Sequence, residues 1–94
     1  MLELGSLSFC KGLALSVEDE PLVRLIAADI LVDANFRVIE ASNSEEALTV
    51  PRAGVEVDVL LSAADMPHGI NGYELARRTH GCWQTVEILI TYGR

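Results

Sequence analysis

Short apolar runs alternate with segments of helical periodicity from Leu13 onward, and this alternation limits the fold more than any other feature of the sequence. Residues 13–17 have the length and composition of a buried strand, and Pro21 then stands where a helix begins. Repeated passage from strand to helix predicts an α/β domain built on a parallel sheet. Because the chain has 94 residues, we expect a single hydrophobic core.

The first predicted helix has the clearest pattern in the chain. Leu22, Ile26 and Ile30 recur every fourth residue, with Val23, Ala27 and Leu31 alongside, so the helix has one broad apolar face. We predict that this face covers the sheet. Asn35 follows as a left-handed helix stop, and residues 36–41 form the next predicted strand.

A capping box predicts the start of the second helix. Asn43 with Glu46, or Ser42 with Glu45, has the three-residue spacing of such a box. Pro51 removes a backbone donor in the third turn, so we expect this helix to be short or kinked.

The remaining elements follow in the same order. Residues 55–63 predict a third strand that is buried on both faces, and residues 64–72 have the composition of a loop. A helix that carries Leu75 comes next, and residues 86–91 predict the fourth strand.

Charge and cysteine content exclude several classes of function. Fourteen acidic against seven basic side chains give a net charge of −7, which disfavours a nucleic-acid partner. No window has the roughly 20 apolar residues of a membrane span, and we detect no secretion signal. Cys10 and Cys82 form no disulfide framework or zinc pattern, so we expect a reduced, cytoplasmic setting.

Polar residues end three of the predicted strands. Glu18 and Asp19 follow the first strand, Asp65 follows the third and Thr91 ends the fourth. Ligands of parallel α/β sheets bind at the carboxyl ends of the strands. Two adjacent carboxylates suit Mg²⁺, and they equally suit a helix N-terminus without any metal.

Three motifs in this order resemble the receiver domain of two-component response regulators. They are V-E-D-E-P at 17–21, D-M-P-x-G-x-N-G at 65–72 and I-L-I-T at 88–91. The resemblance implies a flavodoxin-like (CheY-like) parallel sheet with helices on both faces. It also implies Mg²⁺ ligands at Glu18 and Asp19, a backbone carbonyl ligand at Asp65, and a hydroxyl at Thr91 that senses the phosphoryl group.

The sequence departs from the family at the phosphoacceptor position. The family places an aspartate four residues before the proline of the Met-Pro pair, and here that position is Ala63. A methyl group cannot attack phosphorus, so the resemblance implies a site without its nucleophile and with weakened Mg²⁺ binding. We disfavour Asp65 as a substitute acceptor, because its side chain need not point to the same place.

A second departure is length. The family has five βα units, so we expect a receiver that is truncated after strand four, over residues 13–94, preceded by an extension over 1–12. The last strand would then be an exposed apolar edge. Alternating apolar residues within 2–9 offer one cover as an added strand, but we expect a second copy, and therefore a homodimer.

Three functional hypotheses follow, and none of them is an enzyme. In the preferred one, a degenerate receiver acts as a phosphorylation-independent interaction module that contacts a histidine kinase or another signalling protein through its first helix. In the second, the native or full-length form accepts a phosphoryl group from a histidine kinase. In the third, the chain is an α/β fragment without a partner that is stabilised by self-association.

Overall fold

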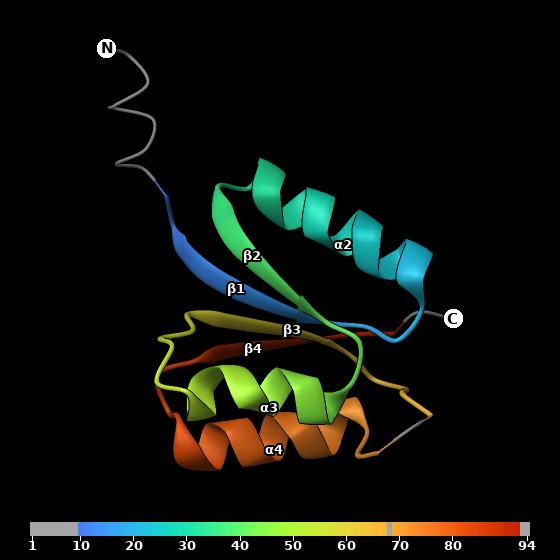
Figure 1. Cartoon of the computed structure of the whole chain (residues 1–94), viewed down its shortest axis with the longest axis vertical. Helices are drawn as coiled ribbons and strands as arrows, with labels where there is room; N and C mark the ends of the chain where they lie inside the picture. The colour runs from blue at the N-terminus through green and yellow to red at the C-terminus, as the bar shows by residue number, and fades with distance from the viewer. Residues whose placement is uncertain (1–9, 68, 93–94) are drawn as a thin grey trace.

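The computed structural model describes residues 10–67 and 69–92, which form one parallel sheet with helices on both sides (Figure 1). The strands lie in the order β2-β1-β3-β4, and every neighbouring pair is parallel. The elements in chain order are β1 Gly12–Val17, α2 Pro21–Asp33, β2 Phe36–Ala41, α3 Ser44–Arg52, β3 Val59–Ala63, α4 Gly72–Cys82 and β4 Glu87–Thr91. The predicted fold class and order of elements are therefore confirmed.

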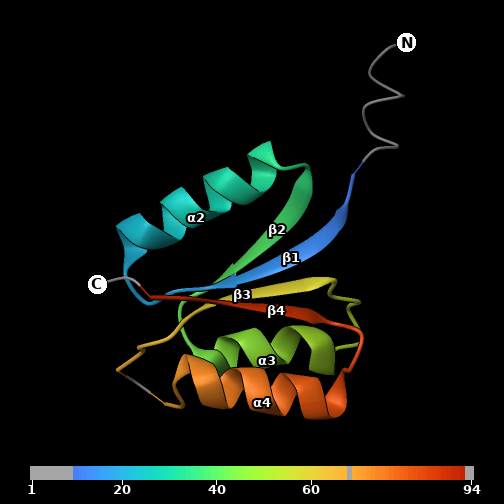
Figure 2. The same cartoon turned by 180° about the vertical axis from the view of Figure 1, so that it is seen from behind.

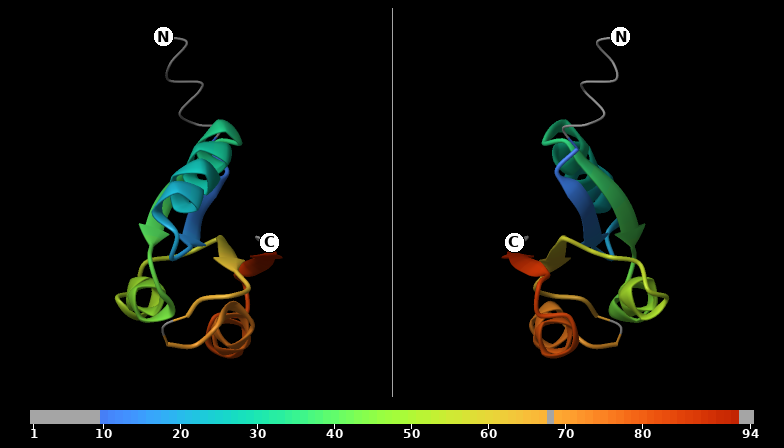
Figure 3. Two further views of the ribbon diagram at one scale, coloured as in Figure 1. Left: turned by 90° about the vertical axis from the view of Figure 1, so that its right-hand side faces the viewer. Right: turned by 90° about the vertical axis from the view of Figure 1, so that its left-hand side faces the viewer.

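The two faces of the sheet are covered unequally. Helices α3 and α4 lie side by side on one face, whereas α2 alone lies on the other (Figures 2 and 3). Helix α2 packs mainly on β2 and β1, and its Leu31 shares a hydrophobic cluster with Val59 at the start of β3. We call the face under α3 and α4 the closed face, and the part of the other face over β3 and β4 that no described helix covers the open half.

Most of the core lies on the closed face. Leu15, Leu48, Leu60 and Leu75 are almost fully buried there, and each comes from a different element. A smaller cluster of Ala14, Leu31 and Val59 fills the space between α2 and the sheet. The buried core therefore packs β1 and β3 mainly against α3 and α4, and much less against α2.

Local signals set the predicted helix ends. Asn35 has a φ of 73°, which confirms the left-handed stop after α2. The Asn43 side chain accepts a hydrogen bond from the Glu46 backbone N–H at 2.8 Å, which selects the first of the two possible capping boxes. Pro51 lies inside α3, which is short at nine residues, as expected.

The third strand begins four residues later than predicted. Pairing with β1 starts at Val59, and Asp58 ends the connection that precedes it. The Asp58 carboxylate accepts a hydrogen bond from the Leu13 N–H at 2.8 Å, while its own N–H donates to the Leu13 carbonyl at 2.9 Å. Val57 is buried in the main core. Val57 is the only buried residue among 55–58, so these residues form a connection, and the prediction of a strand there was wrong.

The prediction that the broad apolar face of this helix covers the sheet was right for Leu31 and wrong for Leu22, Ile26 and Ile30. These side chains are 65%, 52% and 62% exposed, whereas Ala28 and Leu31 are buried against the sheet. Helix α2 is apolar on more than one side, so periodicity alone did not separate its buried side from its exposed side. The predicted cover from residues 2–9 lies outside the described residues. No helix in the described part of the chain is long and apolar enough to cross a membrane.

Candidate functional site

Three of the predicted site residues meet at the carboxyl ends of neighbouring strands. Ala63 and Thr91 are register partners in β3 and β4, and Glu18 directly follows β1. The Ala64 N–H donates to the Thr91 carbonyl at 2.9 Å and so extends the pairing beyond β3. Glu18, Ala63 and Thr91 all line the same groove beside α2.

The turn from β1 to α2 is held by its own acidic side chains. The buried Glu18 carboxylate accepts a hydrogen bond from the Glu20 N–H, and the Glu20 carboxylate caps α2 by accepting from the Leu22 N–H, both at 3.0 Å. Arg24 donates to the Glu18 carbonyl at 3.0 Å. Through these hydrogen bonds, Glu18 and Glu20 stabilise the turn between β1 and α2.

Asp19 differs from its neighbours, because one of its carboxylate oxygens is buried without a hydrogen-bond partner. Asp19 lines a cleft of about 310 Å³ that also includes Ser42, Asn43, Met66 and Pro67. A buried carboxylate oxygen without a donor is costly unless a cation or an ordered water satisfies it. The oxygen therefore suits a hard cation such as Mg²⁺.

The other predicted ligands complete this site only in part. Asp65 is exposed, and Ala63 contributes a methyl group that is 7% exposed. Within residues 10–67 and 69–92, no three acidic, histidine or cysteine side chains gather as a metal site. Asp19 thus offers one buried carboxylate oxygen to Mg²⁺, whereas the described residues form no cluster of three carboxylates.

Thr91 is the last residue of β4 and is exposed. Its hydroxyl donates to the Ser62 carbonyl at 3.5 Å, at the outer limit of a hydrogen bond. The hydroxyl therefore lies beside the carboxyl end of β3, where the sequence motif predicts it.

Gly72, the first residue of α4, allows the end of the 64–71 loop to pass close to the end of β3, and sequence analysis missed this role. A Cβ atom at Gly72 would lie 1.9 Å from the Ala63 carbonyl oxygen, so only glycine fits here. The Gly72 N–H also donates to the Ala64 carbonyl at 3.0 Å. The asparagine-glycine pair in the motif was the signal that marked this position.

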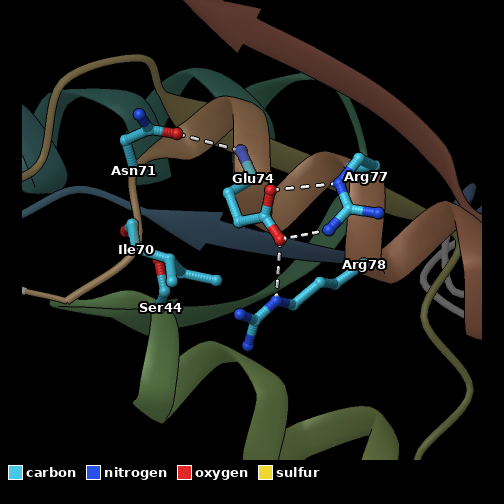
Figure 4. Close-up of polar contacts among 6 residues, drawn as sticks. All are labelled: Ser44, Ile70, Asn71, Glu74, Arg77 and Arg78. Atoms are coloured by element: carbon cyan, nitrogen blue, oxygen red, sulfur yellow. Dashed lines mark hydrogen bonds and ion pairs between the residues drawn. The ribbon is translucent and has the colours of Figure 1, made fainter.

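Polar contacts fix the same loop to both helices of the closed face (Figure 4). Ser44 in α3 donates to the Ile70 carbonyl at 2.8 Å, and Asn71 caps α4 by accepting from the Glu74 N–H at 2.9 Å. Hydrogen bonds from Arg77 and then from Arg78 lower the pKa of Glu74 to about 2.

A second feature that sequence analysis missed is the groove between α2 and the open half, which we call the α2 groove. It has a volume of about 190 Å³. Val23, Ile26 and Ile30 form one wall and Leu61 lies in its floor. Leu89, the register partner of Leu61, extends the floor toward the sheet edge and is 57% exposed. The polar residues that line this otherwise apolar groove are Glu18, Thr91 and Ser16, whose buried hydroxyl has no hydrogen-bond partner among the described residues.

A comparison with protein families finds one match that spans most of the chain. The sequence model described as "Response regulator receiver domain" matches residues 14–93. The matched range contains every predicted site residue and all four strands except the first two residues of β1.

Solved structures agree with this match. The response regulator TrrA of Thermotoga maritima, determined in complex with Mg²⁺-BeF, is 30% identical over 87% of this chain and 71% of its own, with a TM-score of 0.77. The chemotaxis protein CheY4 of Vibrio cholerae is 27% identical over 84% of this chain and 66% of its own, with a TM-score of 0.74. A structure of the histidine kinase ThkA in complex with TrrA also matches, at 27% identity over 87% of this chain and 69% of that chain, with a TM-score of 0.76. This chain therefore spans about two thirds of the length of these neighbours.

Proposed function

This chain belongs to the response regulator receiver domain family, and from that premise we propose that it is a degenerate receiver of two-component signalling that acts as an interaction module without phosphorylation. The observation that carries the proposal is the side chain at the end of β3. Ala63 is buried beside its register partner Thr91, at the strand end where phosphoryl transfer to a receiver needs a carboxylate. Receiver domains are signalling modules, and we assign no catalytic residue to this one.

Weak Mg²⁺ binding is part of the proposal. The buried Asp19 oxygen and the Asp65 carbonyl would hold the ion, with Glu18 adjacent in sequence. Bound Mg²⁺ neutralises charge on phosphoryl oxygens. Ala63 cannot add a carboxylate to this set, so fewer ligands are available and we expect low affinity.

The test is the intact mass of the purified chain after incubation with Mg²⁺ and a small-molecule phosphodonor, beside the Ala63→Asp variant. We expect no adduct on the natural chain. An adduct of one phosphoryl group on the natural chain would show that another residue accepts phosphate and would overturn the proposal.

The Ala63→Asp variant tests the alternative function, which is that the native or full-length form of this receiver accepts a phosphoryl group from a histidine kinase. The specific observation in its favour is that Thr91 is the register partner of position 63 and that Glu18 lines the same groove as both residues. A phosphoryl adduct only on the variant would show that the rest of the site is competent. No adduct on either protein would count against this alternative function.

The proposed partner is a histidine kinase or another cytoplasmic signalling protein that docks on the first turns of α2. The match to TrrA bound to the kinase ThkA supports a kinase as partner. Leu22, at the start of α2, is 65% exposed and so is available for contact. Its exposure also allows Leu22 to be changed without loss of core packing.

Capture of a histidine kinase dimerisation domain tests this partner. We expect Leu22→Lys to weaken capture at least tenfold and to leave the unfolding temperature unchanged. Arg24 is the poorer probe, because it donates to the Glu18 carbonyl and pairs with Glu40, so its removal disturbs the turn. Equal capture by Leu22→Lys and the natural chain would show that this face is not the docking site.

A further inference from the structure

The cleft that contains Asp19 has a second polar wall, formed where β2 passes into α3. Ser42 lies in this wall, and the 64–71 loop forms the wall opposite. Ser44, the buried first residue of α3, donates its hydroxyl to the Ile70 carbonyl at 2.8 Å. This hydrogen bond ties the two walls together, so the cleft is a defined part of the fold.

Ser42 is oriented by Glu46 in the first turn of α3. Oxygen Oε1 of Glu46 accepts from the Ser42 N–H at 2.7 Å and from the Ser42 hydroxyl at 3.0 Å. These two hydrogen bonds lower the pKa of Glu46, so its carboxylate is ionised at neutral pH and can only accept. A hydroxyl has a single proton and two lone pairs. Donation to Glu46 therefore leaves Ser42 Oγ as an acceptor toward any further partner.

A hydrated Mg²⁺ ion offers the complementary groups. Mg²⁺ demands an octahedron of oxygen ligands and dehydrates reluctantly, so it keeps several waters when a protein binds it. Each of these waters turns its oxygen toward the ion and its protons outward, so the outside of the shell consists of donors. The unpaired Asp19 oxygen and Ser42 Oγ, which line the same cleft, are both acceptors.

The size and charge of the cleft agree with such an ion. An octahedral shell of waters at about 30 Å³ each occupies roughly 180 Å³. The cleft has a volume of about 310 Å³. Its Asn43 caps α3, and the positive end of that helix dipole would oppose a cation. Glu45 and Glu46 stand in the first turn of α3 and offset this positive end.

We propose that Ser42 is a water-mediated ligand of the cation that Asp19 binds. Its oxygen accepts a hydrogen bond from a water on the ion, and Glu46 is the positioning residue that keeps the hydroxyl proton away from that water. The inference rests on the Mg²⁺ site of the proposed function and names two further residues of it. Residue 63 takes no part in this contact.

The test is a Mg²⁺ titration of the full chain followed by amide NMR shifts, which report both the affinity and the place of binding. In the natural chain we expect shifts at residues 18–20 and 42–43, and Asp19→Asn should remove them. Ser42→Ala should weaken binding about threefold to tenfold, the range of a single lost hydrogen bond. Ser42→Thr keeps the hydroxyl at a half-buried position and should bind like the natural chain.

Glu46→Gln and Glu45→Gln form a charge-matched pair, since each removes one carboxylate from the first turn of α3. A glutamine amide donates as well as accepts, so Glu46→Gln no longer fixes the Ser42 proton. We therefore expect Glu46→Gln to weaken Mg²⁺ binding more than Glu45→Gln does. Thermal unfolding in EDTA is the second readout, because a merely structural role of Ser42 would lower the unfolding temperature of Ser42→Ala and leave its Mg²⁺ affinity unchanged.

The outcomes separate this inference from the proposed function. The inference alone is overturned if Asp19→Asn abolishes binding while Ser42→Ala leaves it unchanged, if Ser42→Thr binds as weakly as Ser42→Ala, or if the two glutamine variants lose equally. A natural chain that binds no Mg²⁺ would overturn the inference together with the proposed Mg²⁺ site. A phosphoryl adduct on the natural chain, with weakened Mg²⁺ binding in Ser42→Ala, would overturn the phosphorylation-independent module and support the role of Ser42.

Discussion

The closed face and the open half of the same sheet differ in how completely their side chains are buried. On the closed face, Leu60 and Leu75 are 1% exposed and interlock with residues from α3. On the open half, Leu89 is 57% exposed although it occupies the same sheet. Both faces are apolar, so the difference lies in the number of helices that cover each of them.

The difference shows that stability and interaction are divided between the two faces. Burial of apolar area stabilises a domain in proportion to the area removed from water, and the closed face provides most of that burial. An exposed apolar surface on a small domain marks an interaction site. We therefore expect substitutions on the closed face to change folding, and substitutions on the open half to change association.

The largest expected effect comes from a matched pair of truncations. Leu75→Ala removes a fully buried side chain from α4 and should lower the free energy of unfolding by about 2–5 kcal/mol. Leu89→Ala should change it by less than about 0.5 kcal/mol in the monomer. Urea denaturation at a concentration where the chain is monomeric measures both. Similar losses in the two variants would show that the faces do not differ.

A pair of glycines in α4 separates a close backbone contact from helix propensity. Gly72→Ala places a methyl group against the Ala63 carbonyl, so we expect a loss of about 1–3 kcal/mol or more. Gly81 lies in the same helix with nothing within 4 Å of an added Cβ, and Gly81→Ala should stabilise by about 0.5–1 kcal/mol. Thermal unfolding of both variants gives the comparison, and a stabilising Gly72→Ala would contradict the structure.

The sequence predicted the closed face better than the open half, for a physical reason. The buried run of β1 and the helix that carries Leu75 were predicted with the correct element type, and the Asn43 cap marked the start of α3. For α2 the same kind of pattern failed, because periodicity finds apolar residues but does not say what covers them. Leu22 and Ile26 satisfy the helical period and are nevertheless 65% and 52% exposed.

The candidate site shows the same limit. The sequence motifs indicated that Glu18, Ala63 and Thr91 would meet, because parallel strands bring their carboxyl ends to one edge, and the structure places all three beside the α2 groove. The motifs gave no sign that Asp19 lines a different cleft with an unpaired oxygen. That distinction depends on the direction of each side chain in the turn, which the order of residues does not specify. The roles of these residues stay predictions.

A smaller effect is expected on the outer surface of α2. Ile30 is 62% exposed beside the α2 groove, so Ile30→Lys should change the free energy of unfolding by less than about 0.5 kcal/mol. It should reduce the fluorescence of a dye that binds exposed apolar surface, because it breaks the apolar patch. Leu31→Lys at the next position is the contrast, since Leu31 is buried against the sheet and a charge there should unfold the chain. Dye binding equal to that of the natural chain would show that Ile30 is not part of the patch.

The smallest effect concerns the exposed rim of the closed face, where Arg77 and Arg78 hold the pKa of Glu74 at about 2, below its usual 4.5. A depressed pKa in the folded state stabilises the fold wherever the carboxylate is ionised, so the contribution is complete above about pH 4.5 and disappears as the pH falls toward 2. Because the group is exposed, the effect on stability is modest and decreases further in salt.

We expect Glu74→Gln to lower the unfolding temperature slightly at neutral pH and to unfold like the natural chain once the pH has fallen to about 2. Arg77→Gln should reproduce part of this change, since Arg77 is the first cause of the shift. A difference between Glu74→Gln and the natural chain that stayed constant over this whole pH range would assign the effect to the start of α4, where Glu74 follows the Asn71 cap, and not to the ion pairs.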